Sequence, residues 1–227
     1  QRPTVGIFST GDELVEGNEP LLPGQIRDSN RFSLVALLES DGFETVDLGL
    51  IPDNEEAIET TVREGVAKCD ALITTGGVSM GDYDYVKVVL NKIGDMRWMQ
   101  IAIKPAKPFA FGVVQGVPVF GLPGNPVSSM VSYLLLAKPA LNKMMGKKSI
   151  LPKVFHGIAA DDFRRRADGK THFVRSFLHE EKGATLLSPI GKQGSHQLSG
   201  MAEANTLSIV PDGDGVTNGN PIEYFRF

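Results

Sequence analysis

The sequence predicts an α/β fold in which helices cover both faces of a mostly parallel sheet, giving three layers. A small, mostly antiparallel β domain follows it. Up to residue 145, short apolar runs alternate with longer stretches at helical spacing, which is the pattern of βα units. Beyond residue 150 the apolar runs are short, and turn signals such as Asp168-Gly169 separate them. We therefore expect two domains, over residues 1–147 and 150–227.

The order of elements follows from these runs. Buried strands are predicted at 4–9, 45–51, 70–75 and 117–122, and further strand-like runs at 96–103 and 109–114. A helix follows the polar cluster 28–30 and ends at Gly42, and Asp53 caps a second helix through 57–66. Two more helices are predicted at 84–91 and 127–145. The β domain has predicted strands at 154–158, 172–179, 185–188, 206–210 and 222–227.

Composition narrows the class of protein. A net charge of −4 argues against broad nucleic-acid binding, which favours a basic surface. No apolar run approaches the roughly 18–20 residues of a membrane span, and no signal peptide is visible. The single cysteine, Cys69, cannot form an internal disulfide, so we expect a small core residue in a cytoplasmic protein.

The predicted turns of interest all follow strands, at 10–13, 52–53, 76–84 and 122–129. In parallel sheets, ligands bind beyond the carboxyl ends of the strands, so folding would bring these turns together. The turn 76–84 is rich in glycine and leads into a helix, where free N–H groups favour an anion. It also carries Asp82 and Asp84, and carboxylates from several strand ends can share one Mg2+. The alternative is an ordinary strand-to-helix turn with solvated acids.

Two other segments could bind anions. Lys104 and Lys107 stand three apart in a stretch that two prolines hold extended, so they can project as fixed charges. In the turn before the last long helix, Asn125 is a good cap and Ser128 adds a hydroxyl donor. A solvated basic corner and a well-capped helix are the alternatives. The run 164–166 is predicted to be a solvated loop, and the four histidines lack metal-ligand spacing.

Five motifs in order, and a sixth near the end, carry a family resemblance. They are TGDEL at 10–14, DSN at 28–30, GGVSMGD at 76–82, KPAKPF at 104–109, GLPGNPVS at 121–128 and LSGMAEAN at 198–205. Together they closely resemble the MoeA family of molybdopterin molybdenumtransferases, which is similar to the E domain of gephyrin. The resemblance spans nearly the whole chain. It implies a molybdopterin-binding, MogA-like α/β domain followed by a β-barrel.

The resemblance also implies an activity. The family inserts molybdenum from molybdate into adenylylated molybdopterin and releases AMP, a late step of molybdenum cofactor biosynthesis, with Mg2+ assisting. It implies catalytic roles for Glu13, Asp53 and Asp84. The cation would be held by Asp12, Glu13, Asp53, Asp82 and Asp84. Substrate and oxyanion contacts would come from Thr10, Gly76, Gly77, Ser79, Lys104, Lys107, Gly124, Asn125 and Ser128.

Family members carry two further domains ahead of the first motif. In family dimers, a domain of the partner subunit helps to close the site, so we expect a homodimer for the full-length form and slow turnover by this stretch alone. A MogA-like adenylyltransferase would act upstream. The family usually has glycine where Ala106 stands, which makes the backbone there less free.

Two alternatives stay open. Adenylyltransferases similar to MogA share the α/β domain and use ATP. They usually carry Gly-Gly-Thr-Gly where this chain has Gly-Gly-Val-Ser at 76–79, and they lack the β domain. The second alternative is a non-catalytic scaffold that binds a peptide, as the gephyrin E domain does.

Overall fold

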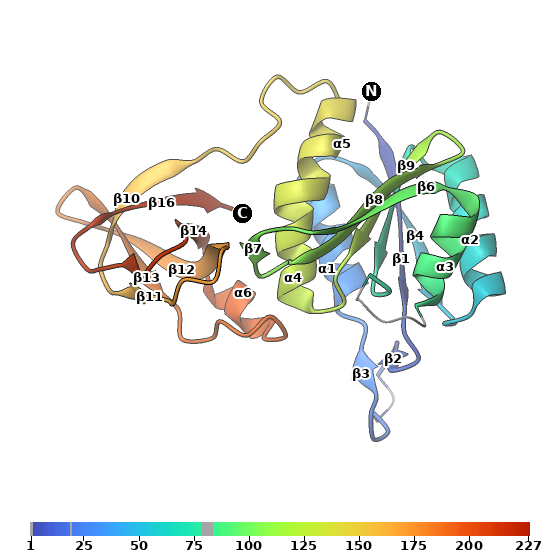
Figure 1. Ribbon diagram of the computed structural model, residues 1–227, viewed down its shortest axis with the longest axis horizontal. Coiled ribbons are helices and arrows are strands. Elements are labelled where there is room, and N and C mark those ends of the chain that lie inside the picture. Colours follow the sequence, from blue (N-terminus) through green and yellow to red (C-terminus); the bar gives the residue numbers. More distant parts are fainter. Residues whose placement is uncertain (1, 19, 79–83) are drawn as a thin grey trace.

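The computed structural model describes residues 2–18, 20–78 and 84–227. An α/β domain and a β-barrel lie side by side (Figure 1). The central sheet has the order β4-β1-β5-β9-β8-β6. Its strands are β4 (Glu44–Ile51), β1 (Thr4–Thr10), β5 (Ala71–Thr75), β9 (Val117–Leu122), β8 (Pro108–Val114) and β6 (Asp95–Gln100). The first four are parallel to one another, whereas β8 runs antiparallel to both of its neighbours, β9 and β6.

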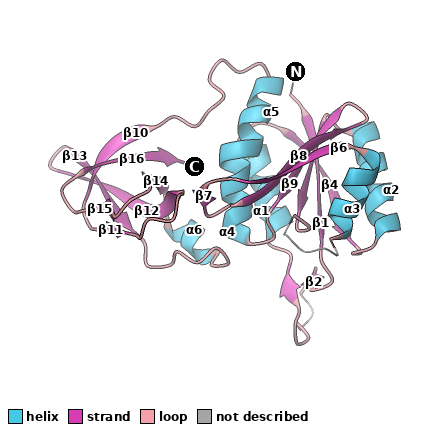
Figure 2. Cartoon of the chain, viewed as in Figure 1, coloured by secondary structure: helices cyan, strands magenta, loops and turns pink. Residues whose placement is uncertain are grey.

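Helices cover both faces of the sheet, as predicted (Figure 2). One layer holds α1 (Asn30–Ser40), α4 (Pro126–Ser132) and α5 (Lys138–Met144), and the other holds α2 (Glu55–Lys68) and α3 (Tyr85–Ile93). Along β5, Ile73 packs into the core under the first layer and Leu72 into the core under the second. This alternation is what places one buried strand between two helical layers.

Two predicted local features differ in detail. The second helix is capped by Asn54, whose side chain accepts from the N–H of Ala57 at 2.9 Å, and not by Asp53. The long helix predicted at 127–145 is continuous in direction but contains a π-helical turn, Tyr133–Ala137, between α4 and α5. Across the described residues, no helix combines the length and apolar character that crossing a bilayer requires.

The barrel is closed by five strands. Their order is β13 (Ala184–Pro189), β10 (Phe155–Ala159), β16 (Pro221–Arg226), β14 (Thr206–Val210) and β12 (Thr171–Glu181), and β12 pairs back with β13. Leu187, Ile222 and Tyr224 fill its interior. Shorter elements flank it, namely β11 (Phe163–Arg164), β15 (Gly215–Val216) and α6 (Ser199–Glu203). The predicted β domain is therefore confirmed as a barrel.

The two domains share structure at their junction. The short strand β7 (Ile103–Lys104) comes from the α/β domain but pairs in parallel with β12 of the barrel. At the start of α4, the N–H of Val127 donates to the carbonyl of Ser195 at 3.0 Å. Leu207 and Phe225 of the barrel pack into the core that α1 and α4 cover. These contacts fix the barrel next to the carboxyl edge of the sheet.

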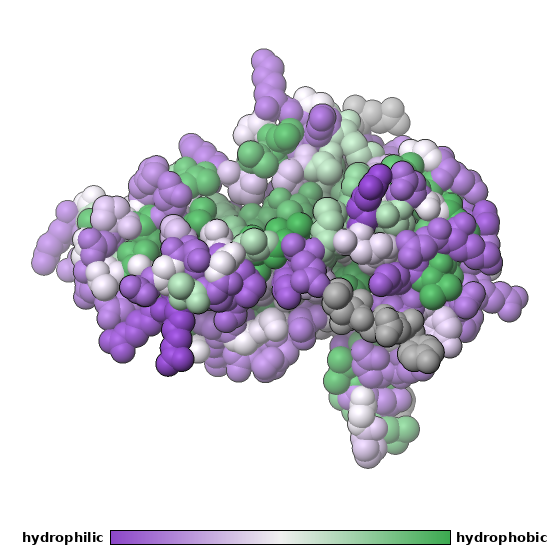
Figure 3. Space-filling view, viewed as in Figure 1, coloured by the Kyte–Doolittle hydropathy of each residue, from purple (hydrophilic) through white to green (hydrophobic). Residues whose placement is uncertain are grey.

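A narrow arm leaves this edge after β1. It contains the paired strands β2 (Leu14–Val15) and β3 (Ile26–Arg27) and projects away from the body of the α/β domain (Figure 3). Arg31 at the start of α1 is buried and pairs with Asp28, Asp47 and Glu16. Because Glu16 lies on the arm, this ion-pair cluster fixes the base of the arm to the domain.

Candidate functional site

A cleft of about 350 Å³ lies at the carboxyl ends of β1, β5 and β9. Its lining comes from five segments that are far apart in the sequence. It consists of Thr10, Glu13, Leu14, Ile26, Asn30, Thr75, Gly76, Val78, Pro108, Pro123, Gly124 and Asn125. Of the predicted site residues, Thr10, Glu13, Gly76, Gly124 and Asn125 are therefore brought together here.

Glycine allows these turns to approach closely. Gly76 has φ +92°, and a Cβ at that position would lie 2.7 Å from the carbonyl oxygen of Thr10. Its N–H donates to the carbonyl of Leu122 at 3.2 Å, which ties the end of β5 to the end of β9. A Cβ on Gly124 would lie 3.8 Å from the Cα of Gly76. The floor of the cleft is thus largely backbone, which can offer N–H donors to an anion.

Asn30 links two of the turns, although it was not among the predicted site residues. Its side-chain Nδ2 donates to Thr75 Oγ1 at 2.8 Å and to the carbonyl of Gly124 at 2.7 Å. Both N–H groups of the amide are used in this way, so Asn30 holds the end of β5 against the turn before α4. The available signal was the DSN motif at 28–30, which we interpreted as a helix start and as a family motif without giving Asn30 a role in the site.

The predicted acids surround the cleft at different depths. Asp53 accepts from Thr10 Oγ1 at 3.1 Å, and Asp84 caps α3 by accepting from the N–H of Lys87 at 3.3 Å. Burial raises the pKa of Asp84, and the charge of Asp53 raises it further, against the effect of two backbone N–H donors. Asp12 and Glu13 are exposed. Over the described parts of the chain, no three His, Cys, Asp or Glu side chains cluster as a metal site.

The remaining predicted residues of this edge lie next to the cleft. Gly77 has φ +67°, and a Cβ there would collide with Val86 and with Asp84 Oδ1. Ser128 lies in the first turn of α4 and is buried, and Lys107 is exposed directly before Pro108 of the cleft lining. Ser79 and Asp82 fall outside the described residues, so their predicted roles stay predictions.

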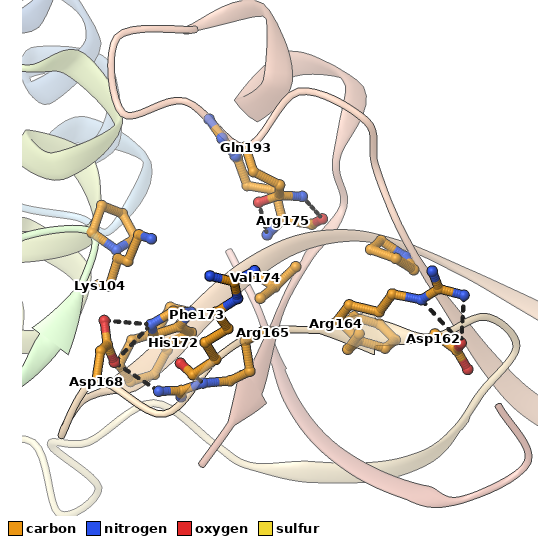
Figure 4. A pocket seen from close by; sticks show the side chains of 14 residues that line it. Lys104, Asp162, Arg164, Arg165, Asp168, His172, Phe173, Val174, Arg175 and Gln193 are labelled. Carbon is orange, nitrogen blue, oxygen red and sulfur yellow. Dashed lines mark hydrogen bonds and ion pairs between the residues drawn. The ribbon is translucent and has the colours of Figure 1, made fainter. Parts of the chain in front are cut away.

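Lys104 lies in a second cavity, between the domains, of about 620 Å³ (Figure 4). The cavity is lined by β7, by the segment 162–168, by β12 and by the loop after β13. Its residues are Lys104, Pro105, Asp162, Phe163, Arg164, Arg165, Arg166, Asp168, His172, Phe173, Val174, Arg175, Pro189 and Gln193. Five of these side chains are Lys or Arg and two are Asp, so the lining carries an excess of positive charge.

Arg175 is the most buried of these cations, with 1% of its surface exposed. Its guanidinium donates to the carbonyls of Gly194 and Gln197, each at 3.2 Å, and burial lowers its pKa. Within the described residues, none of Arg175, Lys104 and Arg166 pairs with a carboxylate. A buried guanidinium without a counter-ion is costly unless an anion joins it, so this cavity is suited to an oxyanion.

Arg165 contradicts the prediction that 164–166 is a solvated loop. Its side chain is 3% exposed and binds Asp168 and Asp212, each at 2.7 Å. Asp168 also accepts from Lys170 at 3.0 Å and contacts His172. The Lys170 bond and His172 lower the pKa of Asp168 to about 2. Arg165 therefore organises the wall of the cavity.

One segment connects the two sites. Lys104 and Pro105 line the cavity, and Pro108, four residues further on, lines the cleft. Ala106 between them is buried and has φ +78°, which is the left-handed region that glycine adopts more easily. The predicted restriction at Ala106 is thus a real backbone requirement of this segment.

The fold and the two sites define a class of protein, the molybdopterin-binding α/β domain joined to a barrel. Residues 6–143 match the family described as a probable molybdopterin binding domain, and residues 157–227 match the MoeA C-terminal region (domain IV). The chain belongs to the MoeA family, which confirms the resemblance noted in the sequence.

Several curated relatives share one name. A molybdopterin molybdenumtransferase of Haemophilus influenzae is 43% identical over 208 residues, covering 91% of this chain and 51% of the relative. One from Nostoc sp. is 36% identical, covering 94% and 50%. The crystal structure of the molybdopterin biosynthesis MoeA protein from Pyrococcus horikoshii OT3 is similar at 27% identity and a TM-score of 0.79, covering 100% of this chain and 54% of that one. The chain spans about half the length of the curated relatives it matches.

Proposed function

We propose that this chain inserts molybdenum from molybdate into adenylylated molybdopterin and releases AMP. The relatives named molybdopterin molybdenumtransferase support this reaction class. The observation that carries the proposal is the segment from Lys104 to Pro108. It joins a cleft of backbone donors and carboxylates to a cationic cavity, so a pyrophosphate-linked pterin and a separate oxyanion can bind side by side.

In the cleft, the backbone N–H groups of Gly77, Gly124 and Asn125 would bind phosphate oxygens, with Thr10 beside them. Gly76 would shape the floor beneath the ligand, because its own N–H already donates to Leu122. Preorganised N–H donors of this kind stabilise charge that develops on a phosphoryl group during cleavage. They act without moving, because glycine packing and Asn30 already hold the turns together.

We propose that two of the acids, Asp53 and Asp84, would hold a divalent cation such as Mg2+, which usually keeps several waters as its other ligands. Asp53 and Asp84 lie close enough to raise the pKa of Asp84, and two partly desolvated carboxylates of this kind favour a shared cation. Glu13 would join Asp53 and Asp84 as a catalytic acid, with Asp12 and Asp82 as further ligands. When bound, the ion would neutralise charge on the phosphate that is cleaved.

In the cavity, Lys104 and Arg175 would bind molybdate oxygens, and Lys107, Ser79 and Ser128 would meet oxygens on the cleft side. Backbone carbonyl groups hold the Arg175 guanidinium in place without neutralising its charge, so this charge can attract the anion. Molybdate that moves from the cavity to the cleft would pass only the short segment 104–108, which lines both.

We further propose the surroundings that the family implies. These are a homodimer for the full-length form, a MogA-like adenylyltransferase as the upstream partner, and cytoplasmic location without nucleic-acid or membrane partners. The division into domains 1–147 and 150–227 is also a proposal, and limited proteolysis tests it by cleavage between the two.

The reaction is tested by supplying the chain with adenylylated molybdopterin, molybdate and Mg2+ and following AMP by chromatography. We expect AMP release that requires both molybdate and Mg2+. Asp84→Asn and Lys104→Met should each slow it by about tenfold or more, which is the typical cost of a lost charge contact in a site. Lys148→Met, an exposed change in the linker, is the control.

Three results would overturn the proposal. AMP release that ignores molybdate would exclude insertion, and consumption of ATP in place of the adenylylated pterin would indicate an adenylyltransferase. Peptide binding by a chain on which Mg2+ and molybdate have no effect would indicate a scaffold.

A further inference from the structure

His172 is a cavity residue that the proposed reaction does not use. It lies on β12 with 13% of its side chain exposed, and it stands opposite Lys104 in the β7–β12 ladder. Both residues line the cavity between the domains (Figure 4). A histidine that faces the lysine of an anion site can change the charge of that site.

The proton arrangement of His172 follows from its contacts. Nε2 lies 3.2 Å from both carboxylate oxygens of Asp168, which can only accept, so Nε2 carries the hydrogen. The second ring nitrogen, Nδ1, has no hydrogen-bond partner among the residues that the structure describes. Nδ1 is therefore the atom that gains a proton when the ring becomes charged.

The charges around the ring come from every neighbouring element. Lys104 approaches from β7, and Arg165, Asp168 and Lys170 come from the segment before β12. Asp212, beyond β14, is held by Arg165. The carboxylates of Asp168 and Asp212 are thus already matched by Arg165 and Lys170. Among the residues that the structure describes, Lys104, Arg166 and Arg175 line the same cavity without a carboxylate partner.

This field favours the neutral ring. Burial lowers the pKa of His172, and the charges of Arg165 and Lys104 lower it further, although Asp168 acts in the opposite direction. A doubly charged oxyanion would reverse the sign of the local field and favour the protonated ring. Binding of the anion and gain of the proton are then linked, because each strengthens the other.

We propose that a tetrahedral dianion binds in this cavity together with one proton, which passes from the buffer to Nδ1 of His172. The proposal rests on the proposed function, which makes this cavity the oxyanion site. No covalent bond to the anion forms or breaks. His172 is a binding residue here, and its role makes the site hold the oxyanion more tightly as the pH falls.

The test is calorimetric titration of the chain with sulfate and, separately, with molybdate, between about pH 6.5 and about pH 8.5, where histidine titrates. Sulfate stays a dianion throughout this range, so any pH dependence belongs to the protein. Titration in buffers of different ionisation enthalpy gives the number of protons taken up. We expect uptake of up to one proton, and affinity that rises about tenfold over this range.

Two variants make the result specific. His172→Gln keeps a donor for Asp168 but cannot gain a proton, so it should bind the anion without proton uptake and without pH dependence. His179→Gln changes another histidine of β12, which stacks on Phe177, and should behave like the wild type. Imidazole NMR of the wild type gives a second measurement, in which the pKa of His172 should rise when sulfate is added.

The outcomes separate the two proposals. Equal proton uptake by the wild type and His172→Gln, or binding by the wild type that ignores pH, refutes the role of His172 and leaves the cavity as the oxyanion site. Failure of both anions to bind the wild type refutes the cavity assignment itself, and the role of His172 falls with it.

Discussion

Replacing Gly76 by alanine is the most direct test of how the cleft is built. The new Cβ would lie 2.7 Å from the carbonyl oxygen of Thr10, a distance that real Cβ atoms do not show. The clash is with backbone at the end of β1, which cannot rotate away as a side chain would. Gly76 also has φ +92°, so alanine is strained there even without the clash.

The two costs can be separated. The left-handed backbone costs alanine about 1–2 kcal/mol. Forcing an extra carbon into a packed position costs about 1–3 kcal/mol more. Gly116, in the turn between β8 and β9, has φ +86° but no atom within 4 Å of its Cβ position. Gly116→Ala therefore carries only the first cost, and Gly76→Ala should lose roughly 1–3 kcal/mol more stability.

Urea unfolding followed by fluorescence measures this difference. The single tryptophan, Trp98, lies on β6, so its signal reports the α/β domain that contains both glycines. We expect equal slopes and a lower midpoint for Gly76→Ala than for Gly116→Ala. Equal midpoints for the two variants would show that the turns are not packed as described, and the backbone floor of the cleft would lose its support.

Three further variants test other parts of the structure. Burial places the pKa of Asp84 above its usual value, so ionisation of Asp84 weakens the fold as the pH rises through that pKa. Asp84→Asn still caps α3, so without Mg2+ it should match or exceed the wild type in thermal stability at pH 7 and lose that advantage at about pH 3. A variant less stable than the wild type at pH 7 would contradict this. The pKa of Asp168 is lowered from 3.8 to about 2, so the ionised carboxylate stabilises the fold fully above pH 3.8, and this stabilisation is lost as the pH falls towards 2. Asp168→Asn should remove this part of the acid destabilisation, which acid titration followed by circular dichroism measures. An acid transition equal to that of the wild type would count against the role of Asp168. Tyr133→Phe keeps the ring but removes a hydrogen bond of 2.7 Å to Asp41. It should lower the free energy of unfolding, measured in urea, by about 1–2 kcal/mol. An unchanged midpoint would show that this hydrogen bond makes no net contribution to stability.

The sequence predicted the layers well because they depend on local periodicity. Runs such as 71–75 and 117–122 carry no charged residue and are mostly apolar, and the structure places them in the centre of the sheet as β5 and β9. The run 96–103 was predicted as one strand, yet it divides into β6 and β7. The reason is a distant partner, since β7 pairs with β12 some seventy residues later in the chain, and periodicity does not encode partners.

The sequence predicted those parts of the site that are formed by glycine-containing turns at the ends of strands. The turns that carry Thr10, Glu13, Gly76 and Gly124 were expected to meet because parallel strands bring their carboxyl ends together, whereas the roles of these residues came from the family resemblance. Arg175 was missed, since a single arginine within an apolar strand pattern gives no sign that it will be buried without a carboxylate. His172 was set aside for lack of metal-ligand spacing, a test that does not apply to an anion site.

The strand β7 affects how the barrel would behave if it were produced without the α/β domain. A polypeptide that starts after residue 147 would lack Ile103 and Lys104, and β12 would then present the unpaired backbone of Thr171 and His172 to solvent. Open strand edges recruit other chains, so the isolated barrel should self-associate through this edge, which β7 covers in the intact chain. Adding back a peptide that contains residues 101–108 should restore a monodisperse barrel.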